Sequence, residues 1–307
     1  MTNRRLISGA EAEAGRTEMS TPKKLNPYYG VLQSGLRDFV LLNGVLFQFS
    51  THIEQRAKDI EAWLGRKDLP APFAASALII ADLTATESGG FPLTFPVGAH
   101  LRKGHRYLTG LHEISARESA WTVAQGYEAF ELFVKRLSSL FLHRNAKQLD
   151  EPPWKARRRK AGACGPVTKR LGDVSAFVDA AYGGANDLLK RLSASLPNLS
   201  EATRNNKLGL DLPNWIGAVS AVRHATIHNR AVVSSTQMQR CGLEQAAILK
   251  RYFPGRAMLN GHRLMLDPQR AEDCLERFAE YAFLIYKMTS LHEGLDYTVF
   301  RQDRIST

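Results

Sequence analysis

Apolar residues recur at intervals of three and four along much of the chain, which is the spacing of one face of an α-helix. The first such stripe begins after Tyr29 and comprises Leu32, Leu36, Phe39, Leu46, Phe49, Ile53, Ile60 and Leu64. It predicts one long helix that ends before Pro70, with a break near Gly44, because glycine weakens a helix interior.

The next segment predicts shorter elements. Residues from Ala74 to Thr84 are expected to form a second, short helix. Residues 88–104 are rich in Gly and Pro, and Phe91, Leu93 and Phe95 alternate within them, so this stretch predicts a loop with a short strand.

A strong helical pattern returns from Ala120 to His143. Its apolar face is formed by Phe130, Phe133, Val134, Leu137, Leu140 and Phe141. Glu131 and Lys135 stand four residues apart on the other side, where they are expected to pair. This helix therefore turns one face to a core and the other to solvent.

Two shorter helices are predicted over Val174–Ala181 and Asn186–Leu196, the second closed by Pro197. Another is expected to start after Asp211, a candidate N-cap, with Pro213 in its first turn.

The last third of the chain predicts a hairpin and a final helix. Asn260-Gly261 favours a type I′ turn between the segments Ala257–Leu259 and Arg263–Leu266. Asp267-Pro268 then begins a helix whose apolar face contains Leu275, Phe278, Ala282 and Ile285.

Together these elements predict a mainly all-α fold. We expect a disordered tail over residues 1–25, an N-terminal helical extension over 26–115, a helical domain over 116–295 and a C-terminal tail over 296–307. The small β-hairpin lies before the last helix of that domain.

Composition narrows the class of protein. Of 307 residues, 44% are hydrophobic and 23% charged, which is typical of a globular chain. Cys164, Cys241 and Cys274 are widely spaced, as in a reducing compartment. No apolar stretch of bilayer length and no apolar core after the basic start are present, so a cytoplasmic protein without a membrane contact is expected.

Charge points to a polyanionic partner. The formal net charge is +11, and nucleic acid is the commonest soluble polyanion, although basic proteins also occur without such a partner. An exposed basic loop is expected over about residues 150–168. Its candidate contacts to an RNA backbone are Trp154, Lys155, Arg157, Arg158, Arg159 and Lys160, with the indole stacking on a base. The alternative is an ordinary solvated surface.

The segment that carries candidate chemistry is Arg223-His224-Ala225-Thr226-Ile227-His228-Asn229. An arginine followed by a histidine at this kind of spacing is weak evidence alone, because three other pairs share it: Arg106 with His112, Arg136 with His143, and Arg256 with His262.

Helical geometry distinguishes this segment. Each residue of a helix advances roughly 100°, so Val219, Val222 and Thr226 lie within about 40° of Trp215 and form a buried stripe. His224 and His228 fall at about 180° and 220°, on the opposite face. Both histidines are therefore expected to face outward, with Arg223 at the border of the stripe.

These residue types suit metal-free cleavage of RNA. A base must remove the proton of the ribose 2′-OH, and an acid must protonate the leaving 5′-oxygen; histidine can do both near neutral pH. Arginine stays charged, and its planar fork matches phosphate oxygens.

The segment, together with Trp215 and Ile216, resembles the signature helix of HEPN domains, whose motif is an arginine, a polar residue, a few variable positions and a histidine. The likeness covers about residues 116–295. The likeness is specific at the motif. Elsewhere it concerns only the arrangement of the elements, among them the long early helix with Glu128 and Glu131, which also resembles the family.

The resemblance implies an all-α, HEPN-like helical bundle, often dimeric, that acts as a metal-independent endoribonuclease. Arg223 and His228 match the catalytic pair and His224 the polar position, while Asn229, Glu128 and Glu131 are candidate supporting groups. No cofactor or metal is implied.

The implied partners are RNA, a second copy joined through the motif helix face, and an antitoxin or defence-system protein. Such a protein is expected to act as a toxin or antiphage effector. One departure concerns regulation: relatives paired with nucleotidyltransferase antitoxins carry a tyrosine two residues after the histidine, where this chain has Arg230.

Three alternatives remain open. The first is a non-catalytic HEPN-like module that binds RNA or protein. The second is a metal-dependent hydrolase, because His224 and His228 stand at i,i+4 and could both ligate zinc, although a third ligand and a motif glutamate are missing. The third is a structural helical protein.

Overall fold

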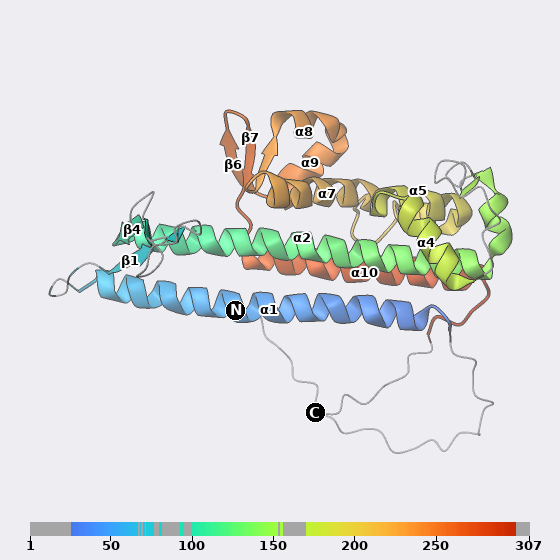
Figure 1. Cartoon of the computed structure of the whole chain (residues 1–307), viewed down its shortest axis with the longest axis horizontal. Coiled ribbons are helices and arrows are strands. Elements are labelled where there is room, and N and C mark those ends of the chain that lie inside the picture. The colour runs from blue at the N-terminus through green and yellow to red at the C-terminus, as the bar shows by residue number, and fades with distance from the viewer. Residues whose placement is uncertain are drawn as a thin grey trace, which may run out of the picture.

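The computed structural model describes residues 26–66, 68, 70, 72–76, 80–81, 93–94, 100–152, 154–155 and 170–298. Three long helices form its frame: α1 (Tyr29–Leu64), α2 (His105–Arg144) and α10 (Pro268–His292). They lie side by side along the long axis of the molecule (Figure 1). The expected mainly helical fold is confirmed.

Aromatic side chains join these three helices into one core. Phe39 of α1 stacks on Phe278 of α10 at 5.9 Å between ring centroids, and Phe130 of α2 lies 5.5 Å from the same ring. Close approach is possible because Gly126 has no side chain: an added Cβ would lie 2.8 Å from Leu275 Cδ2. The long helices therefore pack through aromatic rings at positions left open by glycine.

The predicted division of the chain at residues 115 and 116 is wrong. That boundary falls inside α2, which is continuous from His105 to Arg144. Leu32, Phe39 and Leu46 of α1 belong to the same core cluster as α2 and α10. Gly44 also lies within α1 without a break. A helix packed along its whole length tolerates a glycine that would weaken it in isolation.

A second layer of helices covers this frame (Figure 1). The helix α7 (Leu212–His228) lies along α2, and its Trp215 ring is 5.0 Å from Phe278 of α10. Toward one end lie η1 (Ala146–Asp150), α4 (Leu171–Ala181), α5 (Ala185–Ser195) and α6 (Pro197–Ala202). The helices α8 (Ser235–Arg240) and α9 (Gly242–Tyr252) lie beside α7, near the middle of the molecule's length. The helices predicted at 174–181 and 186–196 are confirmed within a few residues.

The predicted hairpin is confirmed and gains a third strand. Strands β5 (Val232–Ser234), β6 (Gly255–Met258) and β7 (Gly261–Leu264) form an antiparallel sheet in the order β5-β7-β6. Strand β5 begins four residues after the end of α7, so the sheet determines the path of the chain directly after the motif helix.

The predicted type I′ turn at Asn260-Gly261 is wrong by one residue. Met258 pairs with Gly261, so the turn residues are Leu259 and Asn260, and neither has the positive φ of such a turn. Gly261 instead lies in β7, where an added Cβ would meet the Val233 carbonyl oxygen at 2.1 Å. This glycine is needed for close approach of β5.

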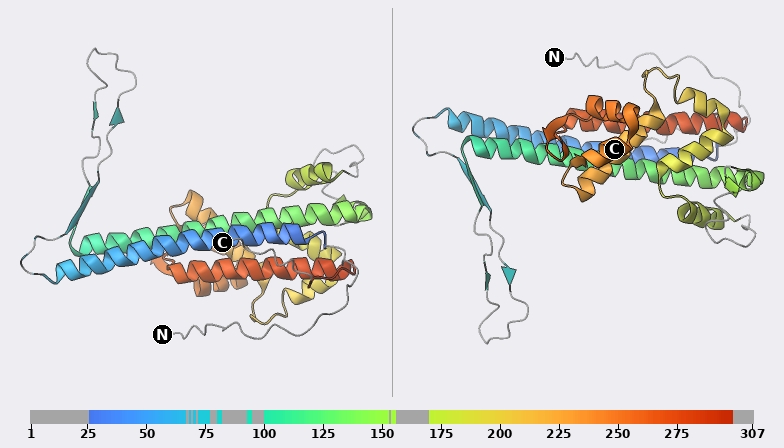
Figure 2. Two further views of the ribbon diagram at one scale, coloured as in Figure 1. Left: turned by 90° about the horizontal axis from the view of Figure 1, so that it is seen from below. Right: turned by 90° about the horizontal axis from the view of Figure 1, so that it is seen from above.

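The predicted helix from Ala74 to Thr84 is also wrong. Its described residues belong to strands β1 (Phe73–Ser76) and β2 (Ile80–Ala81), which pair antiparallel with β4 (His100–Lys103) and β3 (Leu93–Thr94). A short apolar run is ambiguous between helix and strand, and here pairing with a distant segment decides. Figure 2 shows that these strands point away from the helical bundle.

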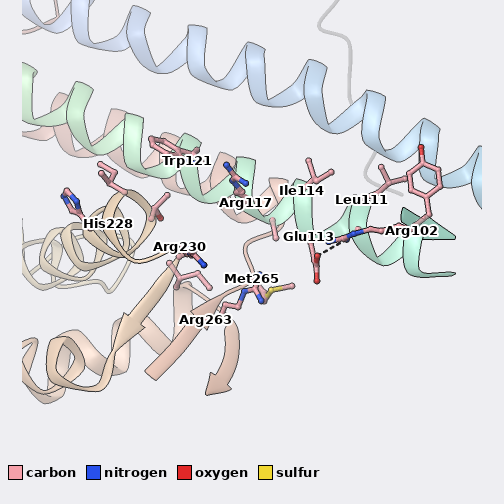
Figure 3. A pocket seen from close by; sticks show the side chains of 17 residues that line it. Arg102, Leu111, Glu113, Ile114, Arg117, Trp121, His228, Arg230, Arg263 and Met265 are labelled. Carbon is pink, nitrogen blue, oxygen red and sulfur yellow. Dashed lines mark hydrogen bonds and ion pairs between the residues drawn. The ribbon is translucent and has the colours of Figure 1, made fainter. Parts of the chain in front are cut away.

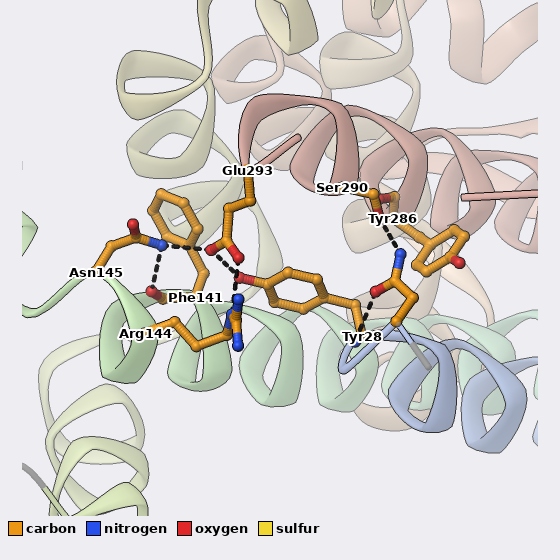
Figure 4. Close-up of polar contacts among 8 residues, drawn as sticks. Tyr28, Phe141, Arg144, Asn145, Tyr286, Ser290 and Glu293 are labelled. Carbon is orange, nitrogen blue, oxygen red and sulfur yellow. Dashed lines mark hydrogen bonds and ion pairs between the residues drawn. The ribbon is translucent and has the colours of Figure 1, made fainter. Parts of the chain in front are cut away.

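A polar cluster ties the ends of the long helices together (Figure 4). Glu293, just after α10, accepts hydrogen bonds from the Tyr28 hydroxyl and from Arg144 Nε at 2.7 Å, and Asn145 also donates to it. Burial, together with the hydrogen bond to Glu293, raises the pKa of Tyr28. The start of α1 is thereby anchored to the ends of α2 and α10.

The remaining predictions on organisation lie outside the described residues. These are the tail over residues 1–25, most of the basic loop and the chain after residue 298. Among the helices that are described, none combines the length and the apolar character needed to cross a bilayer.

Candidate functional site

The motif helix α7 forms as its sequence predicts. Asp211 is the N-cap, because its side chain accepts a hydrogen bond of 2.9 Å from the backbone N–H of Asn214, and Pro213 follows in the first turn. The inward stripe is confirmed as well. Its buried members are Trp215, Val219, Val222 and Thr226.

Both motif histidines face outward, as expected. His224 and His228 are exposed, and their ring centroids lie 4.9 Å apart. Residues four apart on a helix are neighbours on its surface, which explains this proximity. Two imidazoles are thereby presented together on one exposed face of α7.

Arg223 is directed elsewhere. Its Nη2 lies 3.0 Å from Glu128 Oε1 on α2, and the two side chains are 36% and 53% exposed. His228 follows Arg223 by five positions, which corresponds to about 140° around the helix. The arginine and the histidine of the motif therefore face different sides of α7 within one chain.

The carboxylates predicted as supporting groups lie on the same side as Arg223. Glu128 binds Arg223, and Glu131 forms the predicted pair with Lys135 at 3.0 Å. Tyr127 lies with them. Burial raises the pKa of Tyr127, Glu131 adds to this rise, and a hydrogen bond with Ser220 of α7 partly offsets it. Tyr127 was not predicted from the sequence, although it stands four residues before Glu131 and so shares a face of the helix with it.

A cavity of about 750 Å³ opens beside His228 (Figure 3). It lies between α2, the end of α7 and β7. Among the predicted catalytic residues, His228 lines this cavity, whereas Arg223 and His224 do not line it. Its cationic lining residues are Arg102, Arg117, Arg230 and Arg263.

The α2 side of the cavity follows from helical spacing. Ile114, Arg117 and Trp121 stand three, four and seven residues apart and so share one stripe of the helix. Nearby, Arg102 Nη1 lies 3.0 Å from Glu113 Oε2. Gly110 makes room for this arginine, because an added Cβ would lie 2.3 Å from Arg102 Nη1.

The opposite side is formed by the chain that leaves α7. Arg230 and Ala231 have positive φ angles of 52° and 61°, which is unusual for residues other than glycine. The N–H of Ala231 donates to the Ala225 carbonyl at 2.9 Å, and the N–H of Leu264 donates to the Ala231 carbonyl at 2.8 Å. These bonds hold Arg230 beside the cavity and join it to β7, which carries Arg263.

Sequence reasoning missed Arg117, Trp121 and Arg263, and it noticed Arg230 only as a departure from a family pattern. The spacing of Arg117 and Trp121 was a usable signal, but nothing local connects α2 with β7. Asn229 was predicted as a supporting group; it is the exposed C-cap of α7, and its backbone N–H donates to the Ala225 carbonyl.

The prediction that Trp154 stacks on a base is wrong. Its side chain is 0% exposed, its Nε1 donates to Ser195 Oγ at 2.9 Å, and its ring lies edge-on to Tyr182. Trp154 is a core residue that anchors the chain after α2. Lys155 is exposed, while Arg157, Arg158, Arg159 and Lys160 lie outside the described residues.

In the part of the chain that the structure describes, no group of three or more His, Cys, Asp or Glu side chains is placed to hold a metal ion. Comparison with protein-family models, with curated proteins and with solved structures finds no match to this chain. The mainly helical fold is thus established, and the resemblance to HEPN domains stays a prediction.

Proposed function

We propose that this protein is a metal-independent endoribonuclease. In the proposed reaction the ribose 2′-oxygen attacks the adjacent phosphorus, the bond to the 5′-oxygen breaks, and the products are a 2′,3′-cyclic phosphate and a 5′-hydroxyl. The observation that supports this proposal is the pair of exposed imidazoles, His224 and His228, beside a cavity lined with arginines.

The histidines divide the proton transfers in this proposal. One imidazole removes the proton from the 2′-OH while the other donates a proton to the leaving 5′-oxygen, which is the division that general acid–base catalysis requires. We assign the role nearest to the RNA strand to His228, because this histidine also lines the cavity. His224, one helical turn before it, is its partner.

Arg223 is assigned to stabilise the charge that develops on the phosphate. Within one chain its guanidinium is bound to Glu128, which orients it away from the cavity. A second copy that packs against the exposed face of α7 would bring another pair of histidines close to it. The proposal therefore includes the homodimer that the family resemblance implies.

The biological role proposed for such an enzyme is that of a cytoplasmic toxin or antiphage effector, held in check by a partner protein. A net charge of +11 suits an RNA target of any sequence. Growth arrest on expression, relieved by His228→Ala, would support this role, whereas equal growth with both proteins would contradict it.

A non-catalytic RNA-binding module is the second candidate. The observation that favours it is the separation of Arg223 from His228 on α7, since the arginine and the histidine of the motif do not meet in one cleft within a single chain. Under this alternative RNA binds but is released intact.

Incubation of the purified full-length protein with a labelled RNA in EDTA separates the two candidates. The wild type should cleave the RNA, and His228→Ala should not. His112→Ala is the matched control, because His112 is exposed on α2 but does not line the cavity. Binding without cleavage by the wild type would favour the second candidate.

A further inference from the structure

We propose that the cavity beside His228 binds one nucleotide unit, with its phosphate on Arg117, Arg230 and Arg263 and its base on Trp121. As a subsite for the RNA strand, this inference rests on the proposed function. The residues come from α2, from the end of α7 and from β7 (Figure 3).

The charge of the cavity favours an anion. Arg102 is neutralised by Glu113, but within the described ranges no carboxylate lies at ion-pair distance from Arg117, Arg230 or Arg263. All three of these side chains are exposed. Guanidinium groups bind phosphate oxygens with two parallel hydrogen bonds, so three unneutralised arginines form a site for a phosphate.

The aromatic lining favours a base next to that phosphate. Trp121 lies one helical turn after Arg117 and is 36% exposed, although indole rings are mostly buried in proteins. Bases of single-stranded nucleic acids stack on such rings. A phosphate held by Arg117 would therefore have a stacking surface for its own base.

The size of the cavity agrees with a single nucleotide unit. Its volume of about 750 Å³ lies within the range of pockets that bind small ligands and cofactors. Ile114 and Met265 supply apolar surface, and both are partly open to solvent. One unit of a strand can enter while its neighbours continue along the surface toward His224.

The backbone at Arg230 gives independent support. Left-handed backbone is unfavourable for residues with a Cβ, and two consecutive examples persist here, held by the bonds of Ala231 to Ala225 and Leu264. Such conformations gather at ligand-binding sites. The strained pair places the exposed Arg230 side chain at the cavity.

Two sources could supply this ligand chemistry: a single-stranded RNA or a free nucleotide. Binding is therefore measured with two probes, a fluorescein-labelled 2′-O-methyl RNA of twelve nucleotides and adenosine 5′-monophosphate as competitor. The methylated strand has no attacking 2′-OH, so it stays intact and its binding can be measured whether or not the protein cleaves RNA.

The RNA arm uses fluorescence anisotropy on the full chain. Arg117→Ala, Arg230→Ala and Arg263→Ala should each weaken binding roughly tenfold, and the variant that combines all three should lower the magnitude of the slope of log K against log salt by about 0.7, the value for one lost phosphate contact. Arg106→Ala is the matched control. Arg106 is exposed on the same helix, about three turns before Arg117, and does not line the cavity.

Tryptophan fluorescence tests whether a base of the RNA stacks on Trp121. Trp154 and Trp215 are fully buried, and Trp63, which is 40% exposed on α1, does not line the cavity. Quenching by RNA bound in the cavity should therefore come mainly from Trp121 and should persist in Trp63→Phe. Trp121→Phe should lose most of the quench and keep binding within a few fold, because phenylalanine still stacks. Circular dichroism melting of each variant verifies that it is folded, and Arg117→Lys gives a charge-preserving second variant that should bind more tightly than Arg117→Ala.

Weaker binding by the three cavity variants with an unchanged control supports the site, whether or not the wild type cleaves RNA. Displacement of the RNA by adenosine 5′-monophosphate at micromolar concentration would assign the site to a free nucleotide instead of a strand. Equal RNA binding by the wild type and all three cavity variants, or an equal loss with Arg106→Ala, would overturn it.

Discussion

The ring centroids of His224 and His228 lie 4.9 Å apart on the exposed face of α7, and His228 alone of the two also lines the arginine-rich cavity. The two imidazoles are therefore neighbours with different surroundings. This difference assigns them separate roles in the proposed reaction, His228 next to the bound strand and His224 one turn away.

Removal of either histidine should abolish cleavage without unfolding the protein. General acid–base groups typically contribute about 10²–10⁴-fold in rate, so His224→Ala and His228→Ala should each lower the initial rate by that range. Both side chains are exposed, so the free energy of unfolding should change by less than about 0.5 kcal/mol. Rates and urea denaturation on the same preparations would verify this, and a rate loss accompanied by unfolding would count against a catalytic role.

The ion pair between Arg223 and Glu128 should add little stability. Both side chains are partly exposed, and such pairs typically contribute about 0.2–1 kcal/mol. A double-mutant cycle with Arg223→Ala and Glu128→Ala should therefore give a coupling free energy below about 1 kcal/mol. If Arg223 acts on the phosphate, Arg223→Ala should still reduce cleavage strongly. A coupling of several kcal/mol would indicate a structural pair instead.

The polar cluster around Glu293 should contribute more to the free energy of unfolding than the pair of Arg223 and Glu128 does. The Glu293 side chain is 9% exposed and accepts hydrogen bonds from Tyr28, Arg144 and Asn145. Because hydrogen bonds to charged groups contribute about 1.5–3 kcal/mol, Glu293→Ala should lower the free energy of unfolding by roughly 2–4 kcal/mol. Glu276→Ala, on the exposed side of α10, is the control and should change it by less than about 0.5 kcal/mol.

The same cluster predicts a dependence of stability on pH. The pKa of Tyr28 is raised in the folded protein, so folding favours its protonated form. Its contribution should be complete below the unfolded tyrosine pKa of about 10 and should be lost as the pH rises above that value. Tyr28→Phe should therefore lose less stability between pH 9 and about 11 than the wild type. Parallel curves for the two proteins would contradict this role of Tyr28.

Gly126 should not tolerate a side chain. An added Cβ would lie 2.8 Å from Leu275 Cδ2 and 3.0 Å from Phe278 Cε2, so α2 and α10 would have to separate. Overpacking of this kind costs about 1–3 kcal/mol, and Gly126→Val should lower the melting temperature accordingly. Gly172, with no atom within 4 Å of an added Cβ, provides the control, and equal melting of Gly126→Val and Gly172→Val would show that the contact is not tight.

The sequence was sufficient for elements whose signals are local. The cap at Asp211, the buried stripe after Trp215 and the outward position of His224 and His228 all follow from residues within one helix. The last helix and the hairpin before it were predictable for the same reason.

Features that depend on distant contacts were not predictable. The run after Ala74 forms strands because it pairs with residues about 100–103, and Trp154 is buried because it meets Ser195 and Tyr182. The cavity likewise combines α2 with a strand more than a hundred residues later in the chain. No single-segment pattern contains such a site.

The chemistry of the cleaved ends tests the central claim most directly. A defined RNA is incubated in EDTA with the wild type and with His228→Ala, and the product termini are identified by mass spectrometry. Attack by the 2′-OH predicts 2′,3′-cyclic phosphate and 5′-hydroxyl ends with the wild type and none with His228→Ala. Products that carry 3′-hydroxyl and 5′-phosphate ends, or the same products from both proteins, would contradict the account.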